Sequence, residues 1–218
     1  MERTVDKTVK VIRQIERHRP DLLEIRFDLM KPSTSCSEMR SATHLPIIAT
    51  NRPRYEGGAF SGPEATQTRT LMQAAQEGFD YVDLELKTRN VDKLVRQLQR
   101  SGARVIVSHH NMKTTPRLST LESVLRRQKR TRADVCKIVT TARSILDNLS
   151  CLEFVNEHAC RTKLVCFAMG KLGVMSRLLS PALGAYFTYA SSKVGRETAS
   201  GQLPISRVRA IYKELGIA

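Results

Sequence analysis

The sequence predicts an α/β fold in which β-strands alternate with amphipathic α-helices. Short apolar runs rich in β-branched residues recur along the chain, and stretches with helical periodicity separate them. Because parallel neighbours need a long connection, this alternation indicates a parallel sheet whose faces are covered by helices. Seven strands are predicted, at residues 22–27, 46–50, 81–86, 103–108, 135–140, 163–167 and 185–188.

The helices are predicted from apolar residues that recur every three or four positions. Gly102 follows one such stripe, where a helix C-cap belongs. No linker or low-complexity segment interrupts the pattern, so we expect a single domain over residues 1–218. The stripes are Val5, Val9, Ile12 and Ile15; Val91, Leu94, Val95 and Leu98; Leu121, Val124 and Leu125; Ile145, Leu149 and Leu152; and Ile205, Val208, Ile211, Tyr212 and Leu215.

The composition is that of a soluble globular protein. With 218 residues, 41% of them hydrophobic, the chain can bury a substantial core, and no apolar run approaches the roughly 20 residues of a membrane span. The N-terminus mixes charged residues and lacks the apolar block of a secretory signal, which indicates a cytoplasmic protein. The five cysteines lack a CxxC pair and are expected to be reduced thiols. The net charge of +15 favours anionic partners and leaves a nucleic-acid-binding function open.

Polar residues fall within or just after successive predicted strands, and this placement favours a barrel over an open doubly wound sheet. In a (β/α)8 TIM-type barrel the carboxyl ends of the strands converge on one catalytic face, so residues scattered along the sequence would form one site. These residues are Glu24, Arg26, Arg52, Asp83, Glu85, His110 and Lys137.

Lys137 lies inside an apolar strand. If its side chain points inward it is desolvated, and a desolvated lysine exposes the nucleophilic amine that forms an imine with a ketone. A solvent-facing lysine at a strand end is the ordinary alternative, and from this residue alone that alternative is favoured.

His110 follows another strand, and an imidazole can take and return a proton near neutral pH. His109 beside it faces the opposite way on an extended segment, so at most one of the two enters a given site, and a structural histidine is the alternative. The histidines and cysteines show no HExxH motif or paired spacing, so no metal site is predicted. Glu24, Arg26 and Asp28 share one strand face, which fits either substrate binding or a structural ion network.

Taken in order, several segments of the chain resemble the type I 3-dehydroquinate dehydratases of the shikimate pathway. Seven such signals in the right order and spacing are specific, and they extend from the first helix to the C-terminus. They are residues 23–28 (LEIRFD), 48–58 (IATNRPRYEGG), 82–86 (VDLEL), 108–112 (SHHNM) with 115–116 (TP), 133–138 (ADVCKI), 169–177 (MGKLGVMSR) and 201–202 (GQ).

The resemblance implies a cofactor-free and metal-free lyase that converts 3-dehydroquinate to 3-dehydroshikimate in aromatic amino acid biosynthesis. Lys137 would form a Schiff base with the substrate, and His110 would act as acid and base in a syn elimination of water. Arg177 would bind the substrate carboxylate, and Asp83 would orient His110. The resemblance also implies a homodimer. The other substrate-binding residues that it implies are Glu24, Arg26, Arg52, Glu56, Thr198 and Gln202.

The chain also departs from the family pattern. Asn111 stands where aspartate is usual, Thr198 where serine is common and Ser200 where proline is expected, which affects loop geometry more than chemistry. Family members carry a strand before the first helix, whereas only residues 1–5 lie upstream here. We therefore expect a (β/α)8-type barrel whose first strand is missing from this chain, through either a truncated start or another element in its place.

Two other functions stay open. A Schiff-base aldolase of the same architecture would share Lys137 but would not require the carboxylate-binding residues. An anion- or nucleic-acid-binding protein on a degenerate barrel would use the +15 charge. Phosphate binding, however, gives no reason to keep Lys137, His110 and Glu24 in catalytic register, so nucleic acid is not the expected partner and the dehydratase is the preferred hypothesis.

Overall fold

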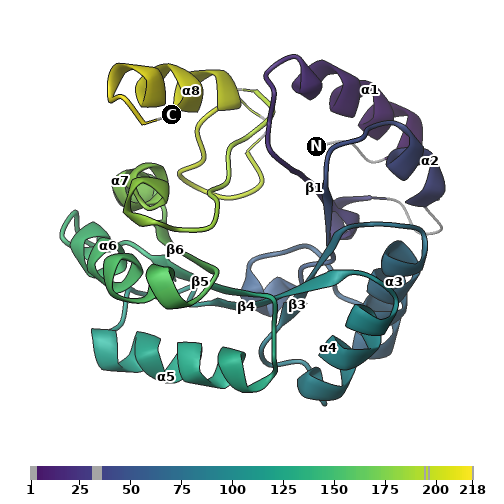
Figure 1. The fold of residues 1–218 in the computed structure, drawn as a ribbon, viewed down its shortest axis with the longest axis horizontal. Helices are drawn as coiled ribbons and strands as arrows, with labels where there is room; N and C mark the ends of the chain where they lie inside the picture. Colours follow the sequence, from purple (N-terminus) through teal and green to yellow (C-terminus); the bar gives the residue numbers. More distant parts are fainter. Residues whose placement is uncertain (1–3, 31–35, 194, 196, 218) are drawn as a thin grey trace. The chain divides into compact units, whose positions relative to one another are not determined.

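The computed structural model describes residues 4–30, 36–193, 195 and 197–217. Six β-strands are hydrogen-bonded in the order β1-β2-β3-β4-β5-β6, so each strand lies next to the strand that precedes it along the chain (Figure 1). The strands are β1 (Leu23–Arg26), β2 (Ile47–Thr50), β3 (Tyr81–Glu85), β4 (Arg104–His110), β5 (Val135–Thr141) and β6 (Leu164–Met169).

Helices separate the strands, which confirms the predicted α/β fold class. None of the helices described is long and apolar enough to cross a membrane. Short 3-10 turns are η1 (Phe27–Leu29), η2 (Arg54–Glu56), η3 (Ala159–Arg161), η4 (Lys171–Gly173) and η5 (Pro181–Leu183). The α-helices are α1 (Val5–Glu16), α2 (Cys36–Ser41), α3 (Glu64–Gln76), α4 (Val91–Arg100), α5 (Leu118–Arg130), α6 (Asp147–His158), α7 (Val174–Leu179) and α8 (Ile205–Glu214).

The chain forms two compact units. The first unit is Met1–Val107 with Arg130–Asp134, and the second is Ser108–Lys129 with Val135–Ala218. Strands β1, β2 and β3 belong to the first unit, and β5 and β6 belong to the second. The single domain expected over residues 1–218 stays a prediction.

In the first unit, β2 pairs in parallel with both β1 and β3. All residues of β2 and β3 are buried, which is typical of parallel strands covered on both faces. The register places Arg26 opposite Thr50, and Thr50 opposite Asp83. Three polar side chains therefore lie in one row near the carboxyl ends of three neighbouring strands.

In the second unit, β5 pairs in parallel with β6, and Lys137 lies opposite Val165. Helices α6 and α7 pack against β6, whose residues are all buried (Figure 1). Phe154 on α6 has no exposed surface and is among the largest fully buried side chains. The core of this unit therefore lies between β6 and these two helices.

The prediction of a seventh strand at residues 185–188 is wrong. This segment has no regular secondary structure, although the Tyr186 amide donates to the Leu164 carbonyl at 2.8 Å. Its aromatic side chains pack on one another: the rings of Tyr186 and Phe187 lie 5.5 Å apart, and those of Phe187 and Tyr189 lie 5.4 Å apart. The strand preference of such residues reflects side-chain packing, which this segment achieves without a ladder.

The apolar stripe predicted at Ile145, Leu149 and Leu152 does not form the buried face of α6. Ile145 precedes the helix and is 51% exposed, and Leu149 is 60% exposed. The helix instead buries Cys151, Phe154 and Val155, together with Asn148. The Asn148 side-chain nitrogen donates to the Leu172 carbonyl at 2.7 Å, and its oxygen accepts from the Ser176 amide at 2.8 Å. The buried face is therefore a different apolar stripe that also carries a hydrogen-bonded asparagine.

Truncating α6 on its buried and exposed faces should have very different effects. Phe154→Ala is expected to lower the free energy of unfolding by about 3 to 5 kcal/mol, because it leaves a cavity in the core. Leu149→Ala, the control on the same helix, should change it by no more than about 0.5 kcal/mol. Urea unfolding followed by circular dichroism measures both values, and equal losses would contradict the observed rotation of α6.

Candidate active site

Arg52, two residues beyond β2, is the centre of a buried ion cluster in the first unit. One guanidinium nitrogen lies 2.7 Å from an oxygen of Asp83, and the other lies 2.6 Å from Glu85 and 3.9 Å from Glu56. Because strand residues two apart face the same way, β3 presents Asp83 and Glu85 together to one arginine. The side chains of all three carboxylates have no exposed surface.

Three carboxylates around one guanidinium leave this cluster rich in negative charge. Burial alone would lower the pKa of Arg52, but the charges of Asp83 and Glu85 raise it overall. Burial raises the pKa of Glu85 to about 7; Arg52 opposes this rise, and Asp83 and Glu56 add to it. Gln67 on α3 donates to the second oxygen of Glu85 at 2.7 Å. Glu85 is therefore a buried carboxyl that gains or loses its proton near neutral pH.

The loop after β2 brings Glu56 back to Arg52. The amide of Phe60 donates to the Arg52 carbonyl at 3.1 Å, which closes the loop. Gly57 has a φ of 83°, in the left-handed region, and a Cβ added to Gly58 would lie 1.9 Å from the Arg52 carbonyl oxygen. The two glycines are thus required for the turn that buries Glu56.

Glu24 and Arg26, the predicted site residues on β1, contact different partners. Arg26 donates through two nitrogens to the two oxygens of Asp28, at 2.8 and 2.7 Å. Asp28 also accepts from the backbone amide of Arg52 at 3.2 Å. Glu24 instead accepts from the hydroxyl of Thr50 at 2.8 Å. The first unit therefore brings together Glu24, Arg26, Arg52, Glu56 and Asp83 near the ends of β1, β2 and β3.

Lys137 points into the second unit from the middle of β5. The residue is 4% exposed, so the solvent-facing alternative is wrong. Its Nζ donates to the hydroxyl oxygen of Tyr189 at 2.9 Å and lies 4.3 Å from the centre of that ring. Sequence reasoning missed Tyr189, because an aromatic residue carries no signal that it contacts a lysine on a distant strand.

His110 is the last residue of β4 and is half-buried, as is His109. Exposure therefore does not choose between the two histidines. The Asn111 amide donates to the Val139 carbonyl at 2.8 Å, which places the end of β4 beside β5, close in sequence to Lys137.

Asn111 also organises the loop that follows β4. Its side-chain oxygen accepts from the amides of Lys113 and Thr114, at 3.0 and 3.1 Å, and its carbonyl accepts from the Thr141 hydroxyl at 2.8 Å. An aspartate oxygen could make the same turn. Asparagine in place of the expected aspartate is therefore compatible with this turn.

Arg177 lies beside the turn that carries Thr198 and Gln202. Its guanidinium is 4.1 Å from the centre of the Phe167 ring and donates to the Ser200 carbonyl at 3.4 Å. Gln202 accepts from both the amide and the hydroxyl of Thr198, at 2.8 and 3.3 Å. The second unit thus brings the three predicted carboxylate-binding residues together, and a planar guanidinium suits a carboxylate.

Gly201 fixes this turn against the end of β6. Its φ is 82°, and a Cβ added there would lie 2.4 Å from the Gly170 carbonyl oxygen. The Gly170 amide in turn donates to the Ser200 carbonyl at 3.1 Å. The replacement of the expected proline by Ser200 leaves the turn closed.

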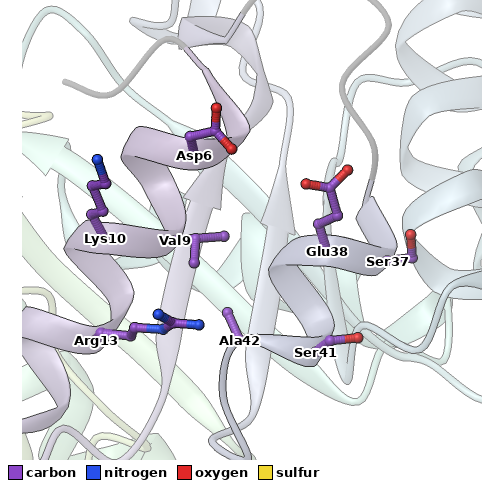
Figure 2. Close-up of a pocket in the computed structure, with 8 residues that line it drawn as sticks. All are labelled: Asp6, Val9, Lys10, Arg13, Ser37, Glu38, Ser41 and Ala42. Atoms are coloured by element: carbon purple, nitrogen blue, oxygen red, sulfur yellow. The ribbon is translucent and has the colours of Figure 1, made fainter.

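A groove of about 660 Å³ lies in the first unit between α1 and α2 (Figure 2). None of the predicted site residues lines it, and we assign it no role in the chemistry. Its lining residues are Asp6, Val9, Lys10, Arg13, Ser37, Glu38, Ser41 and Ala42.

Buried ionisable groups near the ends of successive parallel strands are typical of a (β/α)-barrel enzyme. The type I 3-dehydroquinase family matches residues 1–218. A 3-dehydroquinate dehydratase of Dehalococcoides mccartyi is 37% identical, covering 89% of this chain and 86% of that protein. A 3-dehydroquinate dehydratase of Methanosarcina acetivorans is 32% identical, covering 97% of this chain and 92% of that protein.

Solved structures agree with these relatives. The crystal structure of 3-dehydroquinate dehydratase from Geobacillus kaustophilus superposes with a TM-score of 0.91 at 28% identity, over 99% of this chain and 88% of that one. The chain belongs to the type I 3-dehydroquinase family. It is a dehydratase, and so a lyase, and its six described strands make a partial (β/α)8 TIM-type fold. The predicted family and fold class are confirmed.

The raised pKa of Glu85 should make stability depend on pH. The pKa rises from an ordinary value of 4.5 to about 7 on folding, so the stability it contributes is full below pH 4.5 and is lost as the pH rises through about 7. Glu85→Gln removes this pH-dependent loss of stability, because glutamine does not titrate. The stability of the variant relative to the natural protein should therefore increase by on the order of 3 kcal/mol between about pH 4 and pH 8.

Urea unfolding at a series of pH values measures this difference. Glu153→Gln is the matched control, because Glu153 is exposed and its charge is solvated in both states. A difference between Glu85→Gln and the natural protein that stays constant with pH would show that Glu85 does not titrate on folding.

Proposed function

We propose that the protein converts 3-dehydroquinate to 3-dehydroshikimate through a Schiff base on Lys137. The observation that carries this proposal is the buried amine of Lys137 on β5, in a chain whose relatives are named 3-dehydroquinate dehydratase. A buried amine with fixed orientation is suited to attack a ketone. Family membership also supports a place in the shikimate pathway, and hence in aromatic amino acid biosynthesis.

The proposed reaction begins when the Lys137 amine attacks the C3 ketone. Loss of water from this adduct gives a protonated imine, which draws electrons from C2. His110 removes a C2 proton, the resulting enamine expels the C1 hydroxyl, and His110 returns the proton to that leaving group in a syn elimination. Water then hydrolyses the imine, which releases the product and restores Lys137. One molecule of water is lost overall.

Arg177 is proposed to bind the substrate carboxylate with Thr198 and Gln202. The buried guanidinium and the neighbouring turn support this role. Asp83 is proposed to orient His110, and no cofactor or metal is required by this chemistry. Glu24, Arg26, Arg52 and Glu56 are proposed to bind the ring and its hydroxyl groups.

The cluster around Arg177 favours the dehydratase over a Schiff-base aldolase, because it suits a substrate that carries a carboxylate. The nucleic-acid alternative rests on net charge alone, and we do not propose it. A homodimer and a cytoplasmic location are proposed on the family resemblance alone.

Borohydride should trap the substrate on Lys137. Intact mass after mixing the protein with 3-dehydroquinate and borohydride should show one adduct, and peptide mapping should place it on Lys137, because reduction makes the imine permanent. Lys137→Ala should give neither adduct nor turnover. Lys163→Ala, which changes an exposed lysine, should keep both. An adduct on another lysine, or none on the natural protein, would overturn the proposed function.

The two adjacent histidines should differ in their effect on turnover. His110→Ala is expected to lower kcat by about 10²- to 10⁴-fold, because it removes the group that moves the proton. His109→Ala should have a much smaller effect. The absorbance of the conjugated product measures both rates, and a larger loss in His109→Ala would reverse the assignment.

A further inference from the structure

We propose that the Tyr189 hydroxyl positions the imine nitrogen of Lys137, an inference that rests on the proposed Schiff-base function. Lys137 Nζ donates to this hydroxyl oxygen at 2.9 Å, and it also lies 4.3 Å from the centre of the ring. The nitrogen that would become the imine is therefore held by two features of one side chain.

The Tyr189 ring is itself fixed by its neighbours in the second unit. Phe167 on β6 and Phe187 pack edge-on against it, with centroid distances of 6.2 and 5.4 Å and interplanar angles of 63° and 72°. The Thr188 hydroxyl, next to it in the chain, donates to the Arg177 carbonyl at 2.7 Å and ties the segment to α7. The hydroxyl is thus held at a defined place rather than on a freely rotating side chain.

One hydrogen bond to Tyr189 can orient the nitrogen at each stage of the reaction. A neutral amine that donates one N–H to the tyrosine still has its lone pair available for the ketone. After water leaves, the protonated imine keeps a single N–H, and donation of that N–H to the same oxygen fixes the plane of the C=N bond. The C2–H bond must stand perpendicular to this plane, because its electrons pass into the C=N π system. Tyr189 keeps its own proton throughout.

The ring of Tyr189 adds a second effect. The protonated imine carries a positive charge, and the face of an aromatic ring attracts a nearby cation. The neighbouring ring of Phe167 lies under the guanidinium of Arg177 at 4.1 Å. This aromatic pair therefore fixes the imine nitrogen relative to the group proposed to hold the substrate carboxylate, so the two anchoring groups are held at a defined separation.

Removing only the hydroxyl tests the inference. A hydrogen bond to a charged group corresponds to about a 10- to 100-fold effect on rate, so Tyr189→Phe should lower kcat by that factor. KM should change by less than about threefold, because the lost hydrogen bond is to the lysine and not to the free substrate. The rate at which borohydride traps the Lys137 adduct should fall by the same factor as kcat. Tyr189→Leu, which also removes the ring, should lower both rates further.

Tyr186→Phe is the matched control. Tyr186 lies on the same segment, and its ring is 5.1 Å from the amine of Lys163, so this variant removes a hydroxyl from a second lysine–tyrosine pair. It should leave kcat and the trapping rate unchanged. The thermal unfolding midpoint of Tyr189→Phe should match that of Tyr186→Phe, which separates positioning from a loss of structure.

The outcomes distinguish this inference from the function on which it rests. If the natural protein forms the Lys137 adduct and Tyr189→Phe retains both kcat and trapping rate, the positioning role is overturned and the Schiff-base function stands. A change in KM alone also overturns the positioning role. If the natural protein forms no adduct on Lys137, the proposed function fails and the inference fails with it.

Discussion

The single positive charge of Arg52 is the constraint on which the first unit depends. Three carboxylates with no exposed side-chain surface surround this guanidinium, and isolated buried charges are far less stable in a protein interior than in water. The cluster joins β3 to the loop after β2, so that loop is fixed by charge as well as by its glycines. Burial raises the pKa of Glu85, and the charges of Asp83 and Glu56 add to this rise, which Arg52 opposes.

In the second unit, two buried basic side chains lie over aromatic rings: Lys137 over Tyr189, and Arg177 over Phe167. The face of an aromatic ring attracts a nearby cation. These contacts therefore connect β5 to the segment that follows η5, and α7 to β6.

The sequence predicted the regular part of the fold, and it failed where packing decided the conformation. Six of the predicted strands occur within one or two residues of their expected bounds, because buried parallel strands need continuous β-branched runs that helices interrupt. Residues 185–188 (AYFT) contain a single β-branched residue, and their two aromatic rings pack on each other and, through Phe187, on Tyr189. The predicted face of α6 was also wrong, because the helix buries the stripe of Cys151, Phe154 and Val155 instead. Asn148 lies on the same face, and its hydrogen bonds to residues far along the chain are invisible in the local pattern.

For the site, local chemistry identified candidate residues, but only the order of several motifs distinguished them from structural ion pairs. Lys137 shows the difficulty: a lysine within an apolar strand is more often solvent-facing, and the structure was needed to show that it is buried. Net charge was equally ambiguous. The +15 total says nothing about where the charges lie, whereas several carboxylates are withdrawn into the first unit and paired there. Among the described residues, the buried charged side chains are three acids, Glu56, Asp83 and Glu85, and three basic residues, Arg52, Lys137 and Arg177. Their burial therefore leaves the excess of positive charge on the rest of the chain, and this excess does not by itself identify a nucleic-acid site.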